Sequence, residues 1–245
     1  MHTFINEVRE TLAPGRNDRF GPLPPLLVAM TVVTGLVDSF SYLLLGHVFV
    51  ANMTGNVVFL AFVIVGAHGF SIAASVVALV AFGLGSVLGG RIVQRFGHHR
   101  GHHVAVASAT QALLVAVAMV LALVGSQPFD SGFRYPLIVL LALSMGLQNS
   151  SVRRLAVPDL TTTVLTLTVT GIGADSALGG GKGSKSGRRL ISIAAMFLGA
   201  LVGAALILHV HVAVPLVLAL AIVVVVAAVG HLAGRSNPEW TRAEE

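Results

Sequence analysis

The sequence contains no cysteine among its 245 residues, so it can form neither a disulfide nor a reactive or metal-binding thiolate. Charged residues are also scarce: they make up 10% of the chain, whereas soluble domains carry about 25%. So few charges cannot cover a surface that faces water. The shortage excludes an ordinary soluble protein and indicates that most of the surface faces lipid.

Aromatic residues are few as well, with one Trp and two Tyr. This argues against an aromatic cage for a sugar or a quaternary amine. The chain also lacks a Ser/His/Asp spacing or a carboxylate pair that would indicate an enzyme centre. Its Gly-rich segments lack the strand and the Lys-Ser/Thr context of a phosphate-binding loop. We therefore expect no catalytic activity, no cofactor and no nucleotide.

Long apolar segments are what the sequence does contain, with hydrophobic residues making up 55% of the chain. A helix needs about 20 apolar residues to cross a bilayer, whereas barrel strands would show shorter stretches of alternating polarity. Some of the candidate segments are short or polar, so we predict an all-α, polytopic transmembrane helix bundle with six to eight membrane segments. The candidates are residues 24–45, 47–66, 70–91, 104–124, 136–152, 160–175, 189–208 and 212–233.

The composition divides the chain into four regions. Residues 1–23 lack the apolar core of a signal peptide and are predicted to form a solvated, amphipathic arm. Residues 24–124 and 125–233 are predicted to be two transmembrane repeats, and residues 234–245 a solvated tail. The expected partner of the two central regions is the lipid bilayer.

The net charge of +5 comes from basic loops. In a membrane protein such loops favour the cytoplasmic side and attract anionic lipid, so we expect no nucleic-acid partner. Three candidate segments separate the two basic loops, which would place them on opposite sides. We therefore suspect that the short, Thr-rich segment 160–175 does not fully cross. The loops contain Arg91, Arg95 and Arg100, and Lys182, Lys185, Arg188 and Arg189.

Four histidines in the first basic loop have a spacing that could bind a metal. A solvated basic loop explains them better, so we predict no metal site. They are His98, His99, His102 and His103.

Two polar stretches inside the apolar segments resemble each other and indicate a duplication. Gly35-Leu36-x-Asp38-Ser39 matches Gly146-Leu147-x-Asn149-Ser150. After a four-residue gap, Asn52-x-Thr54 matches Asp159-x-Thr161, and Asn56 falls opposite Thr163. Each copy precedes a helix with a small-x-x-x-small pair, Gly85/Gly89 or Gly199/Gly203, which lets neighbouring helices approach closely. Transporters are often built from such repeats, with the binding site where the copies meet.

The stretch VFVANMTGNVVFLAF, residues 48–62, places Asn52, Thr54 and Asn56 within an apolar segment. For a helical hairpin that turns at Gly46-His47, a rise of about 1.5 Å per residue puts Asp38 level with the space between the two asparagines. An ionisable group at this depth costs about 2.5–3.5 kcal/mol on insertion scales, so it usually faces a cavity or a partner. We predict that Asp38 belongs to a ligand or ion site. The alternative is that it bonds the asparagines and fixes their packing.

The second copy offers a corresponding set. Pro158 disrupts its helix and Asp159 can cap the next one. Arg153 or Arg154 could pair with Asp159 or reach lipid headgroups by snorkelling. Thr162, Thr166 and Thr170 recur every four residues, so we expect a polar stripe on one helical face. Such a stripe alone is a weak signal, because Thr often bonds its own helix. Together with Gln148, Asn149 and Asp159 it indicates the wall of a wet cavity.

These arguments give two sets of candidate residues. The predicted substrate- or ion-binding residues are Asp38, Asn52, Thr54, Asn56, Gln148, Asn149, Arg153, Asp159, Thr162, Thr163 and Thr166. The predicted backbone and packing positions are Gly35, Gly55, Gly85, Gly89, Gly146, Pro158, Gly199 and Gly203.

The stretches TGLVDSFSYLLLGHVFVANMTGN and GLQNSSVRRLAVPDLTTTVLT resemble the two signature regions of the YoaK-like family of bacterial integral membrane proteins. The resemblance extends over residues 25–233. Family members more often carry Ala at the positions of Ser39 and Ser150, which are small-for-small changes. The resemblance implies a multi-pass protein of the bacterial inner membrane built on a domain of unknown function, and it supplies no substrate.

The leading hypothesis is a small secondary transporter or permease with a polar site between two repeats. Asp38 would carry a coupling proton or cation, the asparagines would bind a small polar or ionic substrate, and Arg153 or Arg154 would balance an anionic one. The first alternative is a non-transporting scaffold or lipid-interacting protein whose polar motifs serve helix packing. The second is an intramembrane enzyme, for which a nucleophile and base are lacking. The Gly85/Gly89 face could support a homo-oligomer or packing within one chain.

Overall fold

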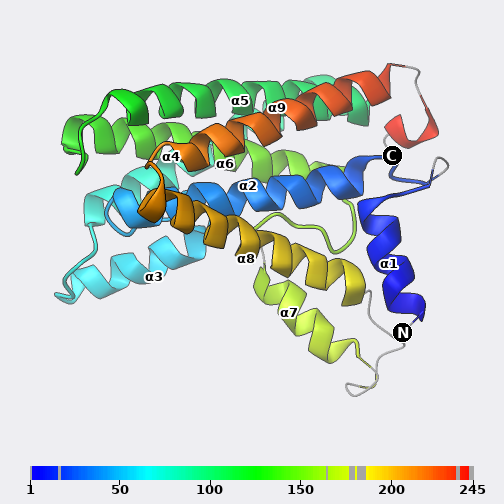
Figure 1. The fold of residues 1–245 in the computed structure, drawn as a ribbon, viewed down its shortest axis with the longest axis horizontal. Helices are drawn as coiled ribbons and strands as arrows, with labels where there is room; N and C mark the ends of the chain where they lie inside the picture. Colours follow the sequence, from blue (N-terminus) through cyan, green and yellow to red (C-terminus); the bar gives the residue numbers. More distant parts are fainter. Residues whose placement is uncertain are drawn as a thin grey trace.

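The computed structural model describes residues 2–15, 18–163, 165–176, 180, 186–235 and 238–242. Within these residues the chain is all-helical, without a strand, which confirms the predicted fold class (Figure 1). The helices are α1 (His2–Leu12), α2 (Leu23–Leu44), α3 (Met53–Ile64), α4 (Ile72–Phe96), α5 (Arg100–Val124), α6 (Ser131–Leu155), α7 (Leu165–Ala174), α8 (Ser186–His209) and α9 (Val214–Gly234), followed by a short 3-10 helix, η2 (Glu239–Thr241).

Six of the described helices are long and apolar enough to cross a membrane: α2, α4, α5, α6, α8 and α9. The helices α3 and α7 have 12 and 10 residues, which at about 1.5 Å per residue span roughly 18 and 15 Å. The hydrocarbon core of a bilayer is about 30 Å thick. Six crossings therefore remain from the predicted range, and both short helices end within the membrane thickness.

The two short helices begin in the middle of the bundle and extend toward its opposite ends (Figure 1). The hairpin prediction required a helix directly after the turn, but the segment before α3 is not helical. Helix α2 ends at Leu44 and α3 begins only at Met53. The backbone turns at Gly46 and His47, which have φ values of 93° and 56°. The chain therefore enters the bundle as an irregular segment and leaves it as a half-length helix.

Both termini lie at the same end of the bundle (Figure 1). With α3 and α7 not crossing, only α5 and α6 separate the α4–α5 turn from the start of α8. Arg95 and Arg100 therefore lie at the same end as Arg188 and Arg189, in agreement with the suspicion that segment 160–175 does not fully cross. Lys182 and Lys185 lie outside the described residues. The positive-inside rule assigns this end, the terminal end, to the cytoplasm.

The long helices pack in close pairs, with α2 on α8, α4 on α6 and α5 on α9. Glycines bring the first two pairs together. A Cβ on Gly35 would meet the backbone of Met196 and Ala200 in α8, and a Cβ on Gly146 would meet the backbone of Phe82 and Ser86 in α4. These contacts confirm that the small residues serve close helix approach.

The small-x-x-x-small pairs are used within the chain. Gly85 and Gly89 of α4 lie against Leu143 and Leu147 of α6. In the same way Gly199 and Gly203 of α8 lie against α2, where they face Val32, Leu36 and Ser39. The Gly85/Gly89 face is therefore buried inside the monomer and is not free to form a homo-oligomer.

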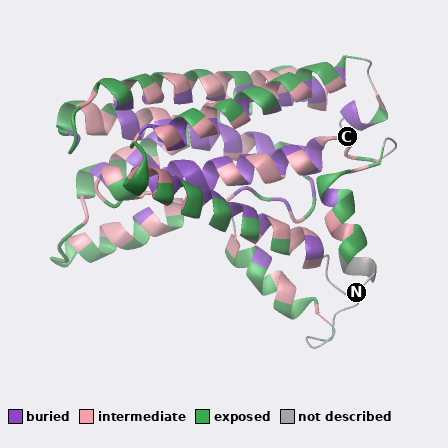
Figure 2. Ribbon diagram, in the orientation of Figure 1, coloured by how far each residue is buried: buried purple, intermediate pink, exposed green. Residues whose placement is uncertain are grey.

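Helices at the centre of the bundle are more buried than helices at its edge (Figure 2). Helix α2 is mostly buried at the centre, and Leu36, Val37 and Phe40 are fully enclosed. Large apolar side chains on the outer helices are exposed instead, including Leu84, Leu113, Phe197 and Leu201. An apolar exterior around a packed centre is the arrangement of a protein that contacts lipid.

The terminal regions are docked on the bundle, so the prediction of a solvated arm and tail is wrong in part. In the arm, Thr11 of α1 is fully buried, and the Glu7 carboxylate accepts a hydrogen bond from the Gly187 N–H at 2.9 Å. In the tail, Trp240 is buried against Gly21, and its carbonyl accepts a bond from Arg100 at 3.4 Å. Both terminal segments therefore close the terminal end of the bundle.

Candidate functional site

A cavity of about 670 Å³ lies where α3 and α7 begin. The first turn of α3, the middle of α4, the last two turns of α6 and the segment leading into α7 form its walls. The lining residues are Ala51, Asn52, Met53, Thr54, Phe82, Ser86, Asn149, Ser150, Val152, Arg153, Ala156, Val157, Leu160, Thr161, Thr162, Thr163, Leu165 and Thr166.

Seven of the eleven predicted binding residues line this cavity. They come from both polar stretches, which lie about a hundred residues apart in the chain, and they are Asn52, Thr54, Asn149, Arg153, Thr162, Thr163 and Thr166. The structure does not bring the other four to its wall, and these are Asp38, Asn56, Gln148 and Asp159.

Asp38 lies one layer behind the cavity and holds the irregular segment before α3. One oxygen of its carboxylate accepts hydrogen bonds from the backbone N–H groups of Val50 at 3.0 Å and Ala51 at 2.9 Å. The other oxygen accepts a bond from the side-chain amide of Asn52. Val50 and Ala51 are buried, so without Asp38 their N–H groups would lack a partner. The structure thus favours the packing alternative for this residue.

Asn149 of α6 makes the corresponding contact in the second polar stretch. Its side-chain oxygen accepts a bond from the Thr163 hydroxyl at 2.5 Å, and its amide donates to the Met145 carbonyl at 2.9 Å. The contacts Asp38–Asn52 and Asn149–Thr163 each span 14 positions of the chain. In both places a polar residue on a long helix therefore fixes the segment that precedes a short helix.

Asn56 and Gln148 are satisfied inside the protein. The Asn56 side chain is fully buried and bonds the backbone of Phe49 twice, accepting from its N–H at 2.9 Å and donating to its carbonyl at 2.6 Å. Gln148 accepts from the Gln111 amide at 2.7 Å and donates to the Thr34 hydroxyl at 2.9 Å. Asn56 closes the turn before α3, and Gln148 links α2, α5 and α6.

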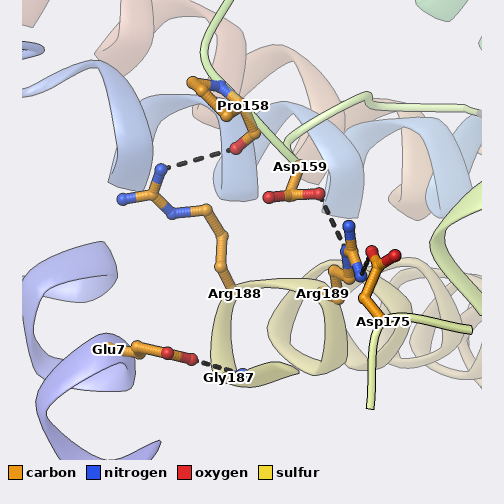
Figure 3. A network of polar contacts seen from close by, with 7 residues as sticks. All are labelled: Glu7, Pro158, Asp159, Asp175, Gly187, Arg188 and Arg189. Carbon is orange, nitrogen blue, oxygen red and sulfur yellow. Dashed lines mark hydrogen bonds and ion pairs between the residues drawn. The ribbon is translucent and has the colours of Figure 1, made fainter. Parts of the chain in front are cut away.

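Of the two alternatives for Arg153 and Arg154, the described residues do not show the ion pair with Asp159. Its carboxylate accepts a bond from Arg189 of α8 at 2.8 Å, and the same guanidinium donates to Asp175 at 2.7 Å (Figure 3). Asp159 also does not cap α7, because it lies in the preceding segment with a φ of 63°. Arg189 therefore bonds both the segment that enters α7 and the residue that follows it.

The predicted threonine stripe is only partly helical, since Thr162 precedes α7 whereas Thr166 and Thr170 lie within it. The Thr162 side chain is 1% exposed, and its hydroxyl has no hydrogen-bond partner among the described residues. Buried polar groups are nearly always paired, so an exception needs an explanation such as a ligand or a water. Thr162 is thus a buried hydroxyl at the cavity wall with its bonding capacity unused.

Arg153 supplies the charge of the cavity. It lies in the last turn of α6, and the lining contains no other charged side chain within the described residues. Its neighbour Arg154 does not line this cavity and contributes instead to a separate pocket.

The first turn of α3 also faces the cavity. Asn52 is its N-cap residue but makes no side-chain cap bond, because its amide donates to Asp38. The first N–H groups of a helix have no partner within it, and they carry the positive end of the helix dipole. The cavity therefore combines a guanidinium, a helix N-terminus and hydroxyl donors.

Two lining residues of α4, Phe82 and Ser86, were not predicted as part of the site. Ser86 lies between Gly85 and Gly89, where it reads as one more small packing residue, and its hydroxyl bonds the carbonyls of Phe82 and Gly146. In the sequence, only its position between Gly85 and Gly89 could have indicated that Ser86 lies near the site.

An aromatic cluster occupies the region beside α3. Tyr42 stacks on Phe49 with ring centroids 4.8 Å apart, and Phe59 stacks on Phe49 and on Phe70 at 5.9 and 4.6 Å. The packed rings thus lie along α3, whose first turn lines the cavity.

Residues 26–229 match the model of a family described as protein of unknown function (DUF1275). The match covers most of the chain and includes all or most of each of the six long helices. The chain belongs to the DUF1275 family. Together with the six apolar helices, this membership agrees with the predicted multi-pass protein of the bacterial inner membrane.

A curated relative of this DUF1275 chain is the UPF0700 transmembrane protein YoaK of Bacillus subtilis (strain 168), which is 32% identical over 146 residues. The aligned region covers 59% of this chain and 63% of the relative, so less than two thirds of that protein is spanned. The resemblance to the YoaK-like family is thereby confirmed. No solved structure is significantly similar to the chain.

Proposed function

We propose that this DUF1275 protein is a small secondary transporter, without catalytic activity, that binds a polar anion in the central cavity. The observation that carries the proposal is the pair of short helices that begin at the cavity and leave in opposite directions (Figure 1). Discontinuous helices form the substrate sites of many transporters, because their first turns present N–H groups and a positive dipole near the middle of the membrane.

The proposal includes an inverted internal repeat, as many transporters have. Each proposed copy would contain three crossings and one short helix, α2–α5 in the first and α6–α9 in the second. The pair of α2 with α8 then corresponds to the pair of α6 with α4, and the glycine contacts correspond as well. An odd number of crossings makes the second copy enter the membrane from the opposite side.

The hydrogen bonds favour a different register for this repeat. Because Asp38–Asn52 and Asn149–Thr163 have the same spacing, Asn52 corresponds to Thr163 without the four-residue gap. In transporters with inverted repeats, the two copies exchange conformations around a fixed site. The packed rings along α3 are one difference between the proposed copies that such a state would contain.

The charge and the donors of the cavity support an anion as the solute. The Arg153 guanidinium can bond a carboxylate or phosphate with two parallel N–H groups. The N–H groups at the start of α3 and the unpartnered Thr162 hydroxyl add donors nearby. Asp38 acts in this proposal as a positioning residue for Asn52, since its carboxylate already accepts three hydrogen bonds.

The non-transporting scaffold is the second candidate, and one observation favours it. The side chains of Asp38, Asn56 and Gln148 find their hydrogen-bond partners inside the protein. Polar residues that only lock helices together would have this property. The cavity and its unpartnered hydroxyl are the features that such a scaffold leaves without a use.

A thermal-stability screen with small carboxylates and inorganic oxyanions tests the proposal on the purified protein. A ligand at 100 times its dissociation constant stabilises the folded state by about 2.7 kcal/mol. We expect at least one anion to raise the melting temperature of the wild type, and Arg153→Gln and Thr162→Val to abolish the rise. The same anion should then be taken up by proteoliposomes that contain the wild type.

Arg154→Gln is the matched control, because it removes the same charge from the adjacent position outside the cavity. Its response to a stabilising carboxylate should match that of the wild type. If no anion stabilises the wild type, or if Arg153→Gln responds unchanged, the cavity is not an anion site and the scaffold is preferred. Asp38→Asn should retain uptake, whereas its loss with stability preserved would assign the carboxylate to coupling.

A further inference from the structure

A second pocket, of about 250 Å³, opens at the terminal end of the bundle, away from the central cavity. It lies between the segment before α2, the start of α5 and the end of α6. At about 30 Å³ of liquid volume per water, it has room for roughly eight water molecules. The lining residues that bear on ligand binding are Arg19, Phe20, Arg100, His103 and Arg154.

Three guanidinium groups meet at this pocket, from three different parts of the chain. Arg19 precedes α2, Arg100 is the first residue of α5, and Arg154 lies in the last turn of α6. Two of them flank one ring, with the guanidinium carbons of Arg19 and Arg100 at 5.5 and 5.7 Å from the centroid of Phe20. An anion bound between these guanidinium groups would be attracted by all three charges.

No acidic side chain lines the pocket in the part of the chain that the structure describes. Two acidic residues adjoin lining residues in sequence. Asp18 lines a separate hollow beside α1 and accepts a bond from the Phe20 N–H at 2.8 Å, and Asp159 accepts a bond from Arg189. The pocket itself is therefore basic throughout its described lining.

His103 gives an independent indication of a ligand. Its side chain is 1% exposed and lines the pocket, yet its Nε2 atom has no hydrogen-bond partner among the described residues. A buried ring nitrogen without a partner is costly. An oxygen of a bound anion would satisfy it, because Nε2 can donate a hydrogen bond when it carries a proton.

We propose that this pocket binds a phosphate group at the cytoplasmic surface of the membrane. The three arginines and His103 would contact its oxygens, and the start of α5 would add the positive end of a helix dipole. The pocket lies at the ends of membrane-crossing helices, on the side that the basic loops assign to the cytoplasm, where anionic lipids are abundant. The phosphate belongs to an anionic lipid headgroup or to a free phosphate.

Native mass spectrometry of the full-length protein tests this proposal with three probes: phosphatidylglycerol, phosphatidylcholine and inorganic phosphate. We expect phosphatidylglycerol to be retained in preference to phosphatidylcholine. Arg154→Gln should weaken this binding about tenfold, which is the loss expected for one charge-assisted hydrogen bond. Arg154→Lys should recover part of it, because the charge is kept while the paired N–H geometry is lost.

Arg153→Gln provides the control, since Arg153 faces the central cavity and should leave lipid retention unchanged. Equal losses in the two arginine variants would indicate general surface charge and overturn the proposal, as would full retention by Arg154→Gln. His103→Leu should also reduce retention. If that variant does not fold, the arginine variants decide alone, because both side chains are exposed.

The probes also identify the source of the phosphate. Displacement of phosphatidylglycerol by inorganic phosphate at similar concentration assigns the pocket to free phosphate. Retention of the lipid against excess inorganic phosphate assigns it to a headgroup. Binding of neither probe above the level of phosphatidylcholine overturns the proposal.

Discussion

Replacing Asp38 tests the role that the structure gives it. Asp38→Ala removes the acceptor of two buried backbone N–H groups, those of Val50 and Ala51. Asp38→Asn keeps one oxygen for both N–H groups, and turning the Asn52 amide over restores the third contact. Both variants lose the carboxylate, so the cost of burying that charge cancels when they are compared.

A buried backbone group without a partner costs about 1–3 kcal/mol, so we expect Asp38→Ala to be less stable than Asp38→Asn by about 2–6 kcal/mol. Total stabilities of folded proteins are about 5–15 kcal/mol, so the difference is large enough to measure. Equilibrium unfolding of both variants in detergent micelles gives the difference directly.

Hydrogen exchange locates the effect. The amides of Val50 and Ala51 should exchange faster in Asp38→Ala than in Asp38→Asn, while the amides at the centre of α5 stay the same. If the two variants unfold alike, or if Asp38→Asn is the less stable one, the acceptor role of Asp38 is wrong.

Three other substitutions probe packing and polar contacts. Gly85→Ala should destabilise the protein by about 1–3 kcal/mol in the same unfolding assay, because its Cβ would meet the Leu143 backbone. The control Gly83→Ala has open space around its Cβ and should be neutral or slightly stabilising. Gln148→Leu should cost about 1–3 kcal/mol by leaving the Gln111 amide unpaired, and the double change to Leu at both positions should recover much of the loss. Arg189→Gln should lower global stability by no more than about 1 kcal/mol, because its ion pairs are partly exposed. It should nevertheless speed proteolysis between α6 and α8. Unchanged proteolysis would contradict the role of Arg189 in holding α7.

The membrane class was predictable from composition. Part of the polar site was predictable from the placement of polar residues within apolar segments. A chain with this few charges has to face lipid. Asn52 and Asn149 are polar residues within apolar segments, where burial without a purpose would be costly. Gly35 and Gly146 were identified for the related reason that close helix contacts need small residues.

The interruption before α3 could not be predicted from hydropathy. Residues 47–66 have the length and apolar character of a crossing, so the period and composition allow one continuous helix. A tertiary contact stabilises the non-helical segment before α3. The Asp38 carboxylate accepts hydrogen bonds from the Val50 and Ala51 N–H groups, which therefore need no helical partner. Hydropathy does not reveal this contact, because Asp38 lies 12 positions before Val50 in the chain.

The partner of Asp159 could not be predicted from the sequence, and the reason is similar. Arg153 and Arg154 are close in sequence, but Arg189 lies 30 positions away and reaches Asp159 from the start of α8. The aromatic cluster and the basic pocket also join residues from separate segments. Sequence spacing carries no information about such contacts until the helix pairs are known.

The pairing of helices across the two halves determines the order in which the protein can assemble. During synthesis α2, α4 and α5 emerge first, yet their main partners α8, α6 and α9 all belong to the second half. The glycine face of α2 therefore stays in contact with lipid or an insertion factor until α8 has been made. A chain that stops after α5 has no close partner for any of its long helices. The two halves should for this reason fold and unfold as one cooperative unit, even if each arose from the same ancestral segment.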